Sequence, residues 1–218
     1  MRVYLFDVCG TLFRDDTTLG FLNFVVRNHK SRSLWLSIVS SRRSPVRWGL
    51  ALAEKLTGRA WIRDCSLLVL RGYSRAQVDR WAREYVAHLL EARREAKPFA
   101  LFEKALGEFE VVLASASLEP VVGALAEKFS VSFVASSLAW SADRCQGYLQ
   151  QDLSGTKEQA ILSKLGSNYV GEGCHCVSDN FSDRSLLEKC QGRTVVLRRP
   201  SHRNFWNSLE AEFIEVFV

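Results

Sequence analysis

The stretch 3–12 reads VYLFDVCGTL, and it decides the fold. Its first residues are apolar and bulky, which predicts a buried strand over Val3 to Val8 with Asp7 near its end. The Gly10-Thr11 pair that follows predicts a turn. An acidic side chain therefore falls where a buried strand gives way to a loop.

A long helical block follows this first strand. Apolar residues recur at helical spacing from residue 17 to about residue 97, and Gly58, Gly72 and Ser74 interrupt the pattern. Pro45 stands where the first turn of a helix tolerates it. The pattern predicts helices over 18–30, 34–43, 46–57, 60–70 and 75–96. The block is thus an all-helical insertion.

Strands and helices alternate in the rest of the chain. The pattern predicts strands at 111–114, 132–135, 175–177 and 194–197, and helices after Pro98 and at 120–129, 156–165 and 183–190, with a hairpin around Gly147. Such alternation is typical of an α/β fold with a doubly wound parallel sheet. We therefore expect an α/β core of residues 1–16 and 98–218 and a helical cap of residues 17–97.

The composition excludes a disordered or repetitive chain, because 47% of the 218 residues are hydrophobic and 24% are charged. The net charge of +5 is spread unevenly. Residues 17–97 hold 16 Lys or Arg against 6 Asp or Glu, whereas the rest of the chain holds 13 against 18. A strongly basic cap is therefore set in an acidic core, which favours an anionic partner.

The six cysteines do not indicate a disulfide framework, because a chain of this length and apolar content needs none. The sequence opens without a secretory signal, and no segment reaches the roughly 18 apolar residues of a membrane span. We therefore expect a cytoplasmic protein. Cys174-His175-Cys176 has the composition of a metal pair, but strand alternation sends the His to the opposite face from the thiols. No second pair lies at ligand spacing, so buried strand cysteines are preferred to a zinc site.

Active groups of open α/β sheets gather at the carboxyl ends of the strands. The predicted core has chemically active side chains at several such ends, and each of them alone is more typical of a turn or cap. In chain order they are Asp7, Cys9 and Gly10; Ser115, Ala116 and Ser117; Lys157, which begins a helix; and Asp179 and Asp183.

This order of residues resembles the haloacid dehalogenase superfamily of phosphatases and phosphotransferases. The matching elements are Asp-x-x-Gly-Thr-Leu, then Ser, Lys and Asp-x-x-x-Asp, with a helical insertion after the first motif. The segment LASAS at 113–117 and the hairpin before Gly155-Thr156-Lys157 are most similar to the phosphoserine-phosphatase-like branch, in which the cap follows the first strand. The resemblance spans nearly the whole chain and implies a Rossmann-like core.

The resemblance implies a nucleophile and a metal site. Asp7 is the expected nucleophile, because a carboxylate that attacks a phosphoryl group forms an aspartyl phosphate and splits one difficult displacement into two easier ones. Asp7, Asp179 and the backbone carbonyl of Cys9 are the expected ligands of Mg²⁺, which prefers hard oxygen atoms.

The resemblance also implies a phosphate cradle. Lys157 is expected to neutralise the phosphate, and Asp183 to hold Lys157 or a metal-bound water. Hydrogen bonds to the phosphate are expected from the Ser115 hydroxyl, from Ala116 and from the amides of Cys9 and Gly10.

Cys9 departs from the family pattern, since most of these phosphatases have a second Asp two residues after the nucleophile. That Asp protonates the leaving oxygen and then deprotonates the attacking water, a contribution of about 10²–10⁴-fold. A thiol, with a reference pKa of about 8.5, stays largely protonated beside Asp7 and donates its proton poorly. Three consequences stay open: a preference for acidic leaving groups, transfer of the phosphoryl group to an acceptor, or binding without turnover.

The cap selects the substrate in this family, and its basic residues favour an anionic one, although solvated helix faces explain most single Arg residues. Leu34-Trp35-Leu36, Arg42-Arg43 and Pro45-Val46-Arg47-Trp48 have the composition of an interfacial helix on anionic lipid. This composition suggests a phosphorylated amphiphile or glycoconjugate as substrate and peripheral contact with an anionic membrane. Nucleic acid is disfavoured, because no recognised module is present and the acidic mouth would repel a polyanion.

The sequence therefore predicts a Mg²⁺-dependent, phosphatase-like hydrolase that cleaves a small anionic phosphate monoester through an aspartyl phosphate. The alternative is a catalytically weak or silent relative that binds a phosphorylated partner or an anionic membrane through its basic cap.

Overall fold

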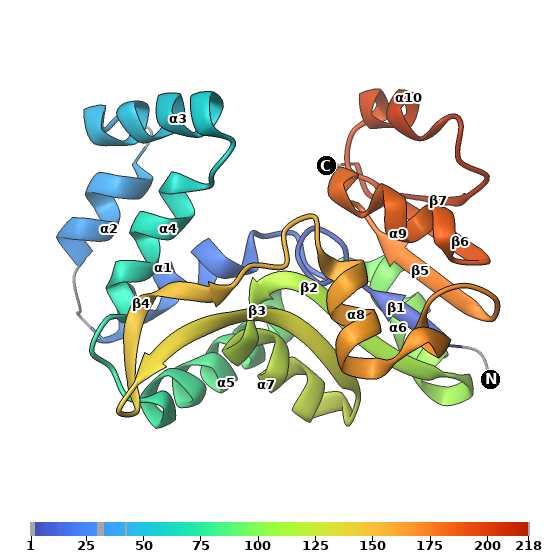
Figure 1. Cartoon of the computed structure of the whole chain (residues 1–218), viewed down its shortest axis with the longest axis horizontal. Helices are drawn as coiled ribbons and strands as arrows, with labels where there is room; N and C mark the ends of the chain where they lie inside the picture. The colour runs from blue at the N-terminus through green and yellow to red at the C-terminus, as the bar shows by residue number, and fades with distance from the viewer. Residues whose placement is uncertain (1–2, 30–32, 42, 218) are drawn as a thin grey trace.

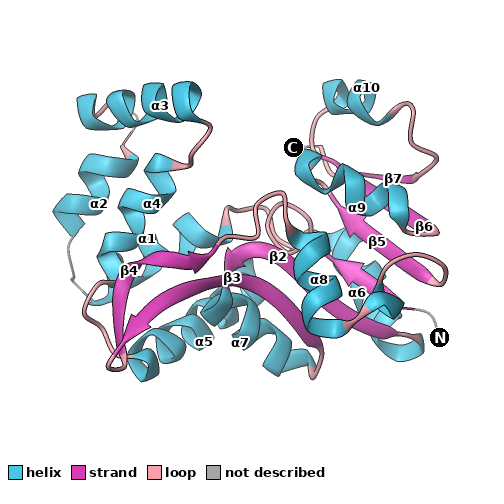
Figure 2. Cartoon of the chain, viewed as in Figure 1, coloured by secondary structure: helices cyan, strands magenta, loops and turns pink. Residues whose placement is uncertain are grey.

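A single sheet carries the predicted site. The computed structural model describes residues 3–29, 33–41 and 43–217, and within them seven strands lie in the order β4-β3-β2-β1-β5-β6-β7. The strands are β1 (Val3–Phe6), β2 (Glu110–Leu118), β3 (Ser132–Ser141), β4 (Arg144–Gln151), β5 (Cys174–Ser178), β6 (Gly192–Leu197) and β7 (Glu212–Glu215). Neighbours pair in parallel except for the antiparallel hairpin β3–β4. The first strand is central, so the residues that follow it lie between β2 and β5 (Figure 2).

Helices cover both faces of this sheet. They are α6 (Ala96–Glu108) and α7 (Glu119–Phe129) on one face and α8 (Lys157–Leu165) and α9 (Arg184–Lys189) on the other. Because side chains alternate along a strand, Leu5 packs in one buried cluster with Ile161 and Leu187, whereas Phe6 packs in the other with Leu125. The predicted doubly wound α/β fold is confirmed.

Five helices between β1 and α6 confirm the predicted helical insertion within the described residues. They are α1 (Thr17–His29), α2 (Ser33–Ser40), α3 (Pro45–Thr57), α4 (Trp61–Leu67), which continues as a 3-10 turn over Leu68–Leu70, and α5 (Arg75–Ala92). The basic residues Lys30, Arg32 and Arg42 lie outside the described residues. α1, α2, α4 and α5 contribute to one hydrophobic cluster with β1 and α7. α4 also packs against β4, whereas α3 lies at the outer end of the cap, away from the sheet (Figure 1).

The two connections between core and insertion lie side by side. The Arg14 amide donates to the Arg93 carbonyl (3.1 Å), and the Glu95 amide donates to the Leu12 carbonyl (2.9 Å). Two ion pairs join the same segments, Arg93 to Asp15 at 3.3 Å and Arg14 to Glu95 at 3.6 Å. The cap boundary at residues 16 and 98 stays a prediction, but the chain leaves and re-enters the core at one paired junction.

The hairpin turn differs in position from the prediction. It lies at Ala142 and Asp143, which adopt positive φ angles of 45° and 61° without being glycine. Gly147 lies inside β4 with φ of +79°, and a Cβ there would be 3.0–3.3 Å from Arg71 and Leu68. The glycine thus marks a close approach of β4 to the cap, because only a residue without a side chain fits there.

The cysteines of β5 are buried, as the alternation predicts. Cys174 and Cys176 pack in one cluster, whereas His175 lies on the other face of the sheet and stacks on Tyr4 at 4.5 Å between ring centroids. A third cysteine, Cys190, lies beside them, and its Sγ is 3.0 Å from that of Cys174. The histidine therefore does not face the thiols.

Candidate active site

Asp7 begins the loop after β1 and is almost fully buried. Its backbone amide donates to the Val177 carbonyl of β5 (2.9 Å), and its Oδ1 accepts from the Val8 amide (2.8 Å). Only 4% of the residue is exposed. The backbone of the central strand thus fixes the carboxylate at the edge where β1 and β5 end.

Lys157, the first residue of α8, joins two carboxylates. Its Nζ lies 3.0 Å from Asp7 Oδ1 and 2.6 Å from Asp183 Oδ2. Asp183 also accepts from the Ser178 hydroxyl at 2.6 Å. Burial alone would lower the pKa of Lys157, but the charges of Asp7 and Asp183 outweigh burial and raise that pKa. The lysine is therefore a permanent cation at this site.

Burial has the opposite effect on Asp7, because it disfavours a negative charge. It raises the pKa of Asp7 above the ordinary value for an aspartate, while the charge of Lys157 opposes that shift. Removing the lysine would leave two buried carboxylates without their common partner.

Asp179 follows β5 and faces the glycine turn. Its Oδ1 accepts from the Thr11 hydroxyl (3.0 Å), and its backbone amide donates to the same hydroxyl (2.9 Å). A Cβ at Gly10 would lie 2.3 Å from Asp179 Oδ2, and Gly10 has φ of +79°, so no other residue fits there without strain. Burial and the charge of Asp7 raise the pKa of Asp179 to about 7.

The residues fit a hard dication. Asp7 and Asp179 are carboxylates with raised pKa values, and a cation between them would offset both their burial and the effect of Asp7 on Asp179. Among the described residues, no three His, Cys, Asp or Glu side chains form a metal-binding group. The two carboxylates and the Cys9 carbonyl would therefore hold Mg²⁺ together with water and substrate oxygens.

The residues of β2 that are predicted to bind phosphate lie within the strand. β2 continues to Leu118 through a shift in its register with β3, so Ser115 is an internal strand residue and does not end the strand, in contrast to the prediction. Ser115 is fully buried and its Oγ accepts from the Ser117 amide at 3.3 Å. The Ala116 carbonyl accepts a hydrogen bond from the Ser136 hydroxyl, which links β2 to β3 where their register shifts.

The amide of Gly10 has a different partner from the one expected. It donates to the Phe13 carbonyl at 2.9 Å and so closes the turn after Asp7. Gly10 therefore shapes the turn and leaves room for Asp179. Its amide forms a hydrogen bond within the protein, in place of the expected one to phosphate.

Cys9 is half-buried, and its Sγ donates to the Asp15 carbonyl at 3.4 Å. Burial, together with the charges of Asp16 and Asp7, raises the pKa of the thiol to about 12. The sulfur therefore carries its proton throughout the physiological range.

A cavity of about 160 Å³ joins five of the predicted residues, Asp7, Cys9, Ser115, Ala116 and Lys157. Gly10, Asp179 and Asp183 are not among its lining residues. Ser117, the last residue of the 113–117 motif, lines the cavity too. Five further lining residues were not singled out by the sequence: Asp16, Thr18, Arg63, Ser154 and Asn180. Asn180 adjoins the predicted Asp179, which could have indicated it.

Arg63 is the lining residue that sequence reasoning had no signal for. It extends from α4 of the cap, and its guanidinium bonds Asp152 (2.6 Å) and the Ser154 hydroxyl (3.2 Å) just before α8. A single Arg in a basic helical block looks like any solvated residue, and only the tertiary fold shows that it reaches the core. The contact ties the cap to the loop that precedes Lys157.

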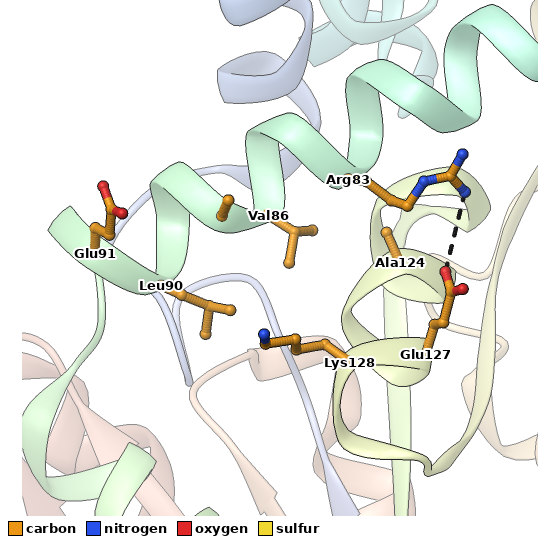
Figure 3. Close-up of a pocket in the computed structure, with 8 residues that line it drawn as sticks. Arg83, Val86, Leu90, Glu91, Ala124, Glu127 and Lys128 are labelled. Carbon is orange, nitrogen blue, oxygen red and sulfur yellow. Dashed lines mark ion pairs between the residues drawn. The ribbon is translucent and has the colours of Figure 1, made fainter.

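A second cavity lies between α5 and α7 and measures about 520 Å³ (Figure 3). Val86, Leu90 and Ala124 give it an apolar wall, and the ion pair of Arg83 with Glu127 spans 4.0 Å beside it. It shares no lining residue with the cavity beside Asp7, so it is separate from the predicted catalytic groups.

The fold and the site together define an α/β core with an inserted helical cap and a buried Asp-Lys-Asp cluster at the strand ends. The family of haloacid dehalogenase-like hydrolases matches residues 4–188, and the chain belongs to this family. Its fold is that of the phosphatase-like hydrolases of the family.

Solved structures support this assignment of the fold. A protein of unknown function from Bordetella pertussis Tohama I has a TM-score of 0.73 at 17% identity, over 98% of this chain and 97% of that one. A phosphoserine phosphohydrolase-like protein from Francisella tularensis has a TM-score of 0.59 at 13% identity, over 98% and 95%. Cytosolic 5'-nucleotidase IIIB bound to cytidine has a TM-score of 0.54 at 16% identity, over 99% and 80%. No curated protein matches the sequence.

Proposed function

We propose that the chain is a Mg²⁺-dependent phosphatase that hydrolyses a phosphate monoester through an aspartyl phosphate on Asp7. The observation that carries the proposal is the contact of the buried Asp7 carboxylate with Lys157. Both residues line one cavity with Ser115. A carboxylate and a fixed cation at one small polar cavity are the groups that phosphoryl transfer requires.

In the first step an oxygen of Asp7 attacks phosphorus, and the bond from phosphorus to the alcohol oxygen breaks. Lys157 favours the ionised, attacking form of Asp7 and neutralises charge on the transferred group. Asp183 holds the lysine in place from the other side. Mg²⁺ held by Asp7, Asp179 and the Cys9 carbonyl would neutralise further charge on the phosphoryl oxygens.

In the second step a water attacks phosphorus of the aspartyl phosphate, which releases inorganic phosphate and restores the Asp7 carboxylate. Both steps gain from a group that donates and then accepts a proton, and Cys9 occupies the expected position of that group. Because the pKa of its thiol is about 12, Cys9 neither donates readily to the leaving alcohol nor accepts from water. We therefore propose a preference for substrates whose leaving groups are acidic.

The substrate class we propose is small anionic phosphate esters, lipid- and sugar-linked ones included. Arg63 and Lys157 supply positive charge at the cavity, which supports an anionic substrate. The neighbours named phosphoserine phosphatase and 5'-nucleotidase are consistent with small phosphorylated compounds.

Asp7→Asn tests the nucleophile. We expect p-nitrophenyl phosphate turnover with Mg²⁺ to fall to background, because an amide oxygen does not form the phosphoryl intermediate. Asp143→Asn, in an exposed turn of positive φ that Asn accepts, is the matched control and should keep full activity. Turnover in Asp7→Asn equal to wild type overturns the proposed mechanism.

Cys9 also supports the second candidate function, which is binding of phosphorylated ligands without hydrolysis. Cys9→Asp distinguishes the two. If only the proton donor is missing, the variant gains up to about 10²–10⁴-fold on an alkyl phosphate, whereas Cys9→Ser gains nothing. If wild type and Cys9→Asp are both inactive on a panel of phosphate esters while Mg²⁺ with BeF₃⁻ still raises the Tm, the binding function replaces the catalytic one.

A further inference from the structure

The outer helix of the cap, α3, presents its apolar side to solvent. Trp48, Leu52 and Leu56 are 68%, 59% and 77% exposed, and they recur every four residues along one face. The other residues on this exposed face are Pro45, Gly49, Ala51 and Lys55. No residue of the helix is buried. Amphipathic helices of folded domains normally turn this side to the core, so the arrangement is inverted.

The opposite face of α3 is the more polar one, and it packs on the cap. Arg47, Leu50 and Glu54 are half-buried there, and Glu54 Oε1 accepts from the Ile62 amide of α4 at 2.9 Å. The helix lies across the outer ends of α2 and α4 and does not approach the sheet (Figure 1). Folding of the core therefore gives no reason for three large apolar side chains at this place.

The charges around this face are predominantly positive. Residues 33–60 contain five Lys or Arg and a single acidic residue, Glu54, whose carboxylate is turned toward α4. Arg43 and Lys55 are exposed within the described part of the segment. Large apolar side chains flanked by cations match a surface that has an apolar interior and anionic headgroups.

We propose that α3 docks the protein on an anionic membrane surface, with Trp48, Leu52 and Leu56 entering the boundary between headgroups and acyl chains. Trp is well suited to that boundary. No helix in the described part of the chain has the length and apolar character to cross a bilayer, so the contact is peripheral. The inference does not rest on the proposed phosphatase function, because α3 holds none of the residues around Asp7.

The experiment is co-sedimentation of the full chain with vesicles at low salt. Vesicles of phosphatidylcholine mixed with phosphatidylglycerol should bind the protein, and vesicles of phosphatidylcholine alone should bind it far less. A variant with Trp48→Ser, Leu52→Ser and Leu56→Ser should lose binding while it keeps its Tm and its turnover of soluble substrate. The matched control changes exposed apolar residues of the core, Tyr148→Ser and Leu162→Ser, and should bind like wild type.

The charge component is tested separately with Arg43→Gln and Lys55→Gln. Each removed charge should weaken binding to the mixed vesicles roughly fivefold, and added salt should remove that difference. Asp7→Asn should bind the vesicles like wild type, so loss of activity and loss of docking are distinguishable.

Two results overturn the proposal. One is a wild-type protein that stays in solution with mixed vesicles at low salt. The other is vesicle binding that the triple α3 variant retains. If the wild type is instead a dimer in sedimentation velocity and the triple variant a monomer, with no binding to vesicles, the face is an interface between two copies of the chain.

Discussion

The core and the outer cap depart from the usual distribution of side chains in opposite directions. In the core, Lys157, Asp7 and Asp183 are charged groups with less than 5% of their surface exposed. In α3, Trp48 and Leu56 are apolar groups with most of theirs exposed. Neither arrangement favours folding, since buried charges lose hydration and apolar groups that stay exposed contribute none of the free energy that their burial would supply. In each region the unusual arrangement lies where we propose chemistry or contact.

Lys157→Met tests the role of the buried charges in the core and has the largest expected effect. It leaves Asp7 and Asp183 buried without their shared cation, which should lower the free energy of unfolding by about 3–5 kcal/mol at neutral pH. Urea denaturation in EDTA measures this change. Lys104→Met, at an exposed position of α6, is the control and should stay within about 0.5 kcal/mol of wild type. Equal stability of the two variants would show that the buried cluster is not held by its charges.

The raised pKa of Asp179 gives the core a pH dependence. Its pKa lies at about 7 in the folded protein, against 3.8 as the ordinary value. The folded state then binds more protons between these values, so stability falls as pH rises through that window. In EDTA we expect the Tm to fall accordingly, and Mg²⁺ to raise the Tm more above this window than below it. Asp179→Asn should reduce both effects, because Asp7 keeps its own raised pKa, and a Mg²⁺ shift independent of pH in the wild type would contradict the expectation.

Arg63→Gln tests whether the two regions act together. The variant loses the 2.6 Å ion pair with Asp152 and the positive charge at the cavity. We expect a KM about tenfold higher with kcat little changed, since binding of an anion weakens before chemistry begins. Stability should change by about 1 kcal/mol or less, because such partly exposed pairs contribute little. Arg80→Gln in α5, which removes a surface pair with Glu84, should leave KM unchanged.

Gly49→Ala tests the stability of α3 in the cap and has the smallest expected effect. A Cβ at Gly49 meets no atom within 4 Å, so the change should stabilise α3 by up to about 1 kcal/mol through helix propensity alone. Gly58→Ala is the contrasting variant, because Gly58 ends the same helix with φ of +70° and Ala there should cost about 1 kcal/mol. Thermal denaturation followed by circular dichroism compares them, and shifts of the same sign would contradict this account.

The local patterns of the sequence predicted most of the fold. Helical spacing in the cap and apolar runs in the core are properties of short segments, so the insertion and the parallel sheet could be read without tertiary information. The hairpin turn could not be placed, because Ala142 and Asp143 adopt positive φ in a position where Gly is the usual signal. β7 was missed, since a four-residue edge strand of sequence EFIE carries little signal.

The candidate site could be predicted where chain order was enough. Asp7, Lys157 and Asp183 were chosen as residues near strand ends and a helix start, and the structure brings them into contact, although their roles in catalysis stay predictions. Arg63 could not be predicted, because its partner Asp152 is 89 residues away in the sequence. The turn at Gly10 was predicted, but the sequence did not show that the Gly10 amide would donate to the Phe13 carbonyl within that turn.

The place of the cap in the chain also sets an order for folding. β1 is synthesised first, yet Val3 pairs with Glu110 on one side and with Cys174 on the other. Contacts over such sequence separations form late, whereas the helices of the insertion need only near neighbours. On the ribosome, β1 must therefore wait for β2 and β5, and Asp7 meets Lys157 and Asp183 only after nearly the whole core has emerged.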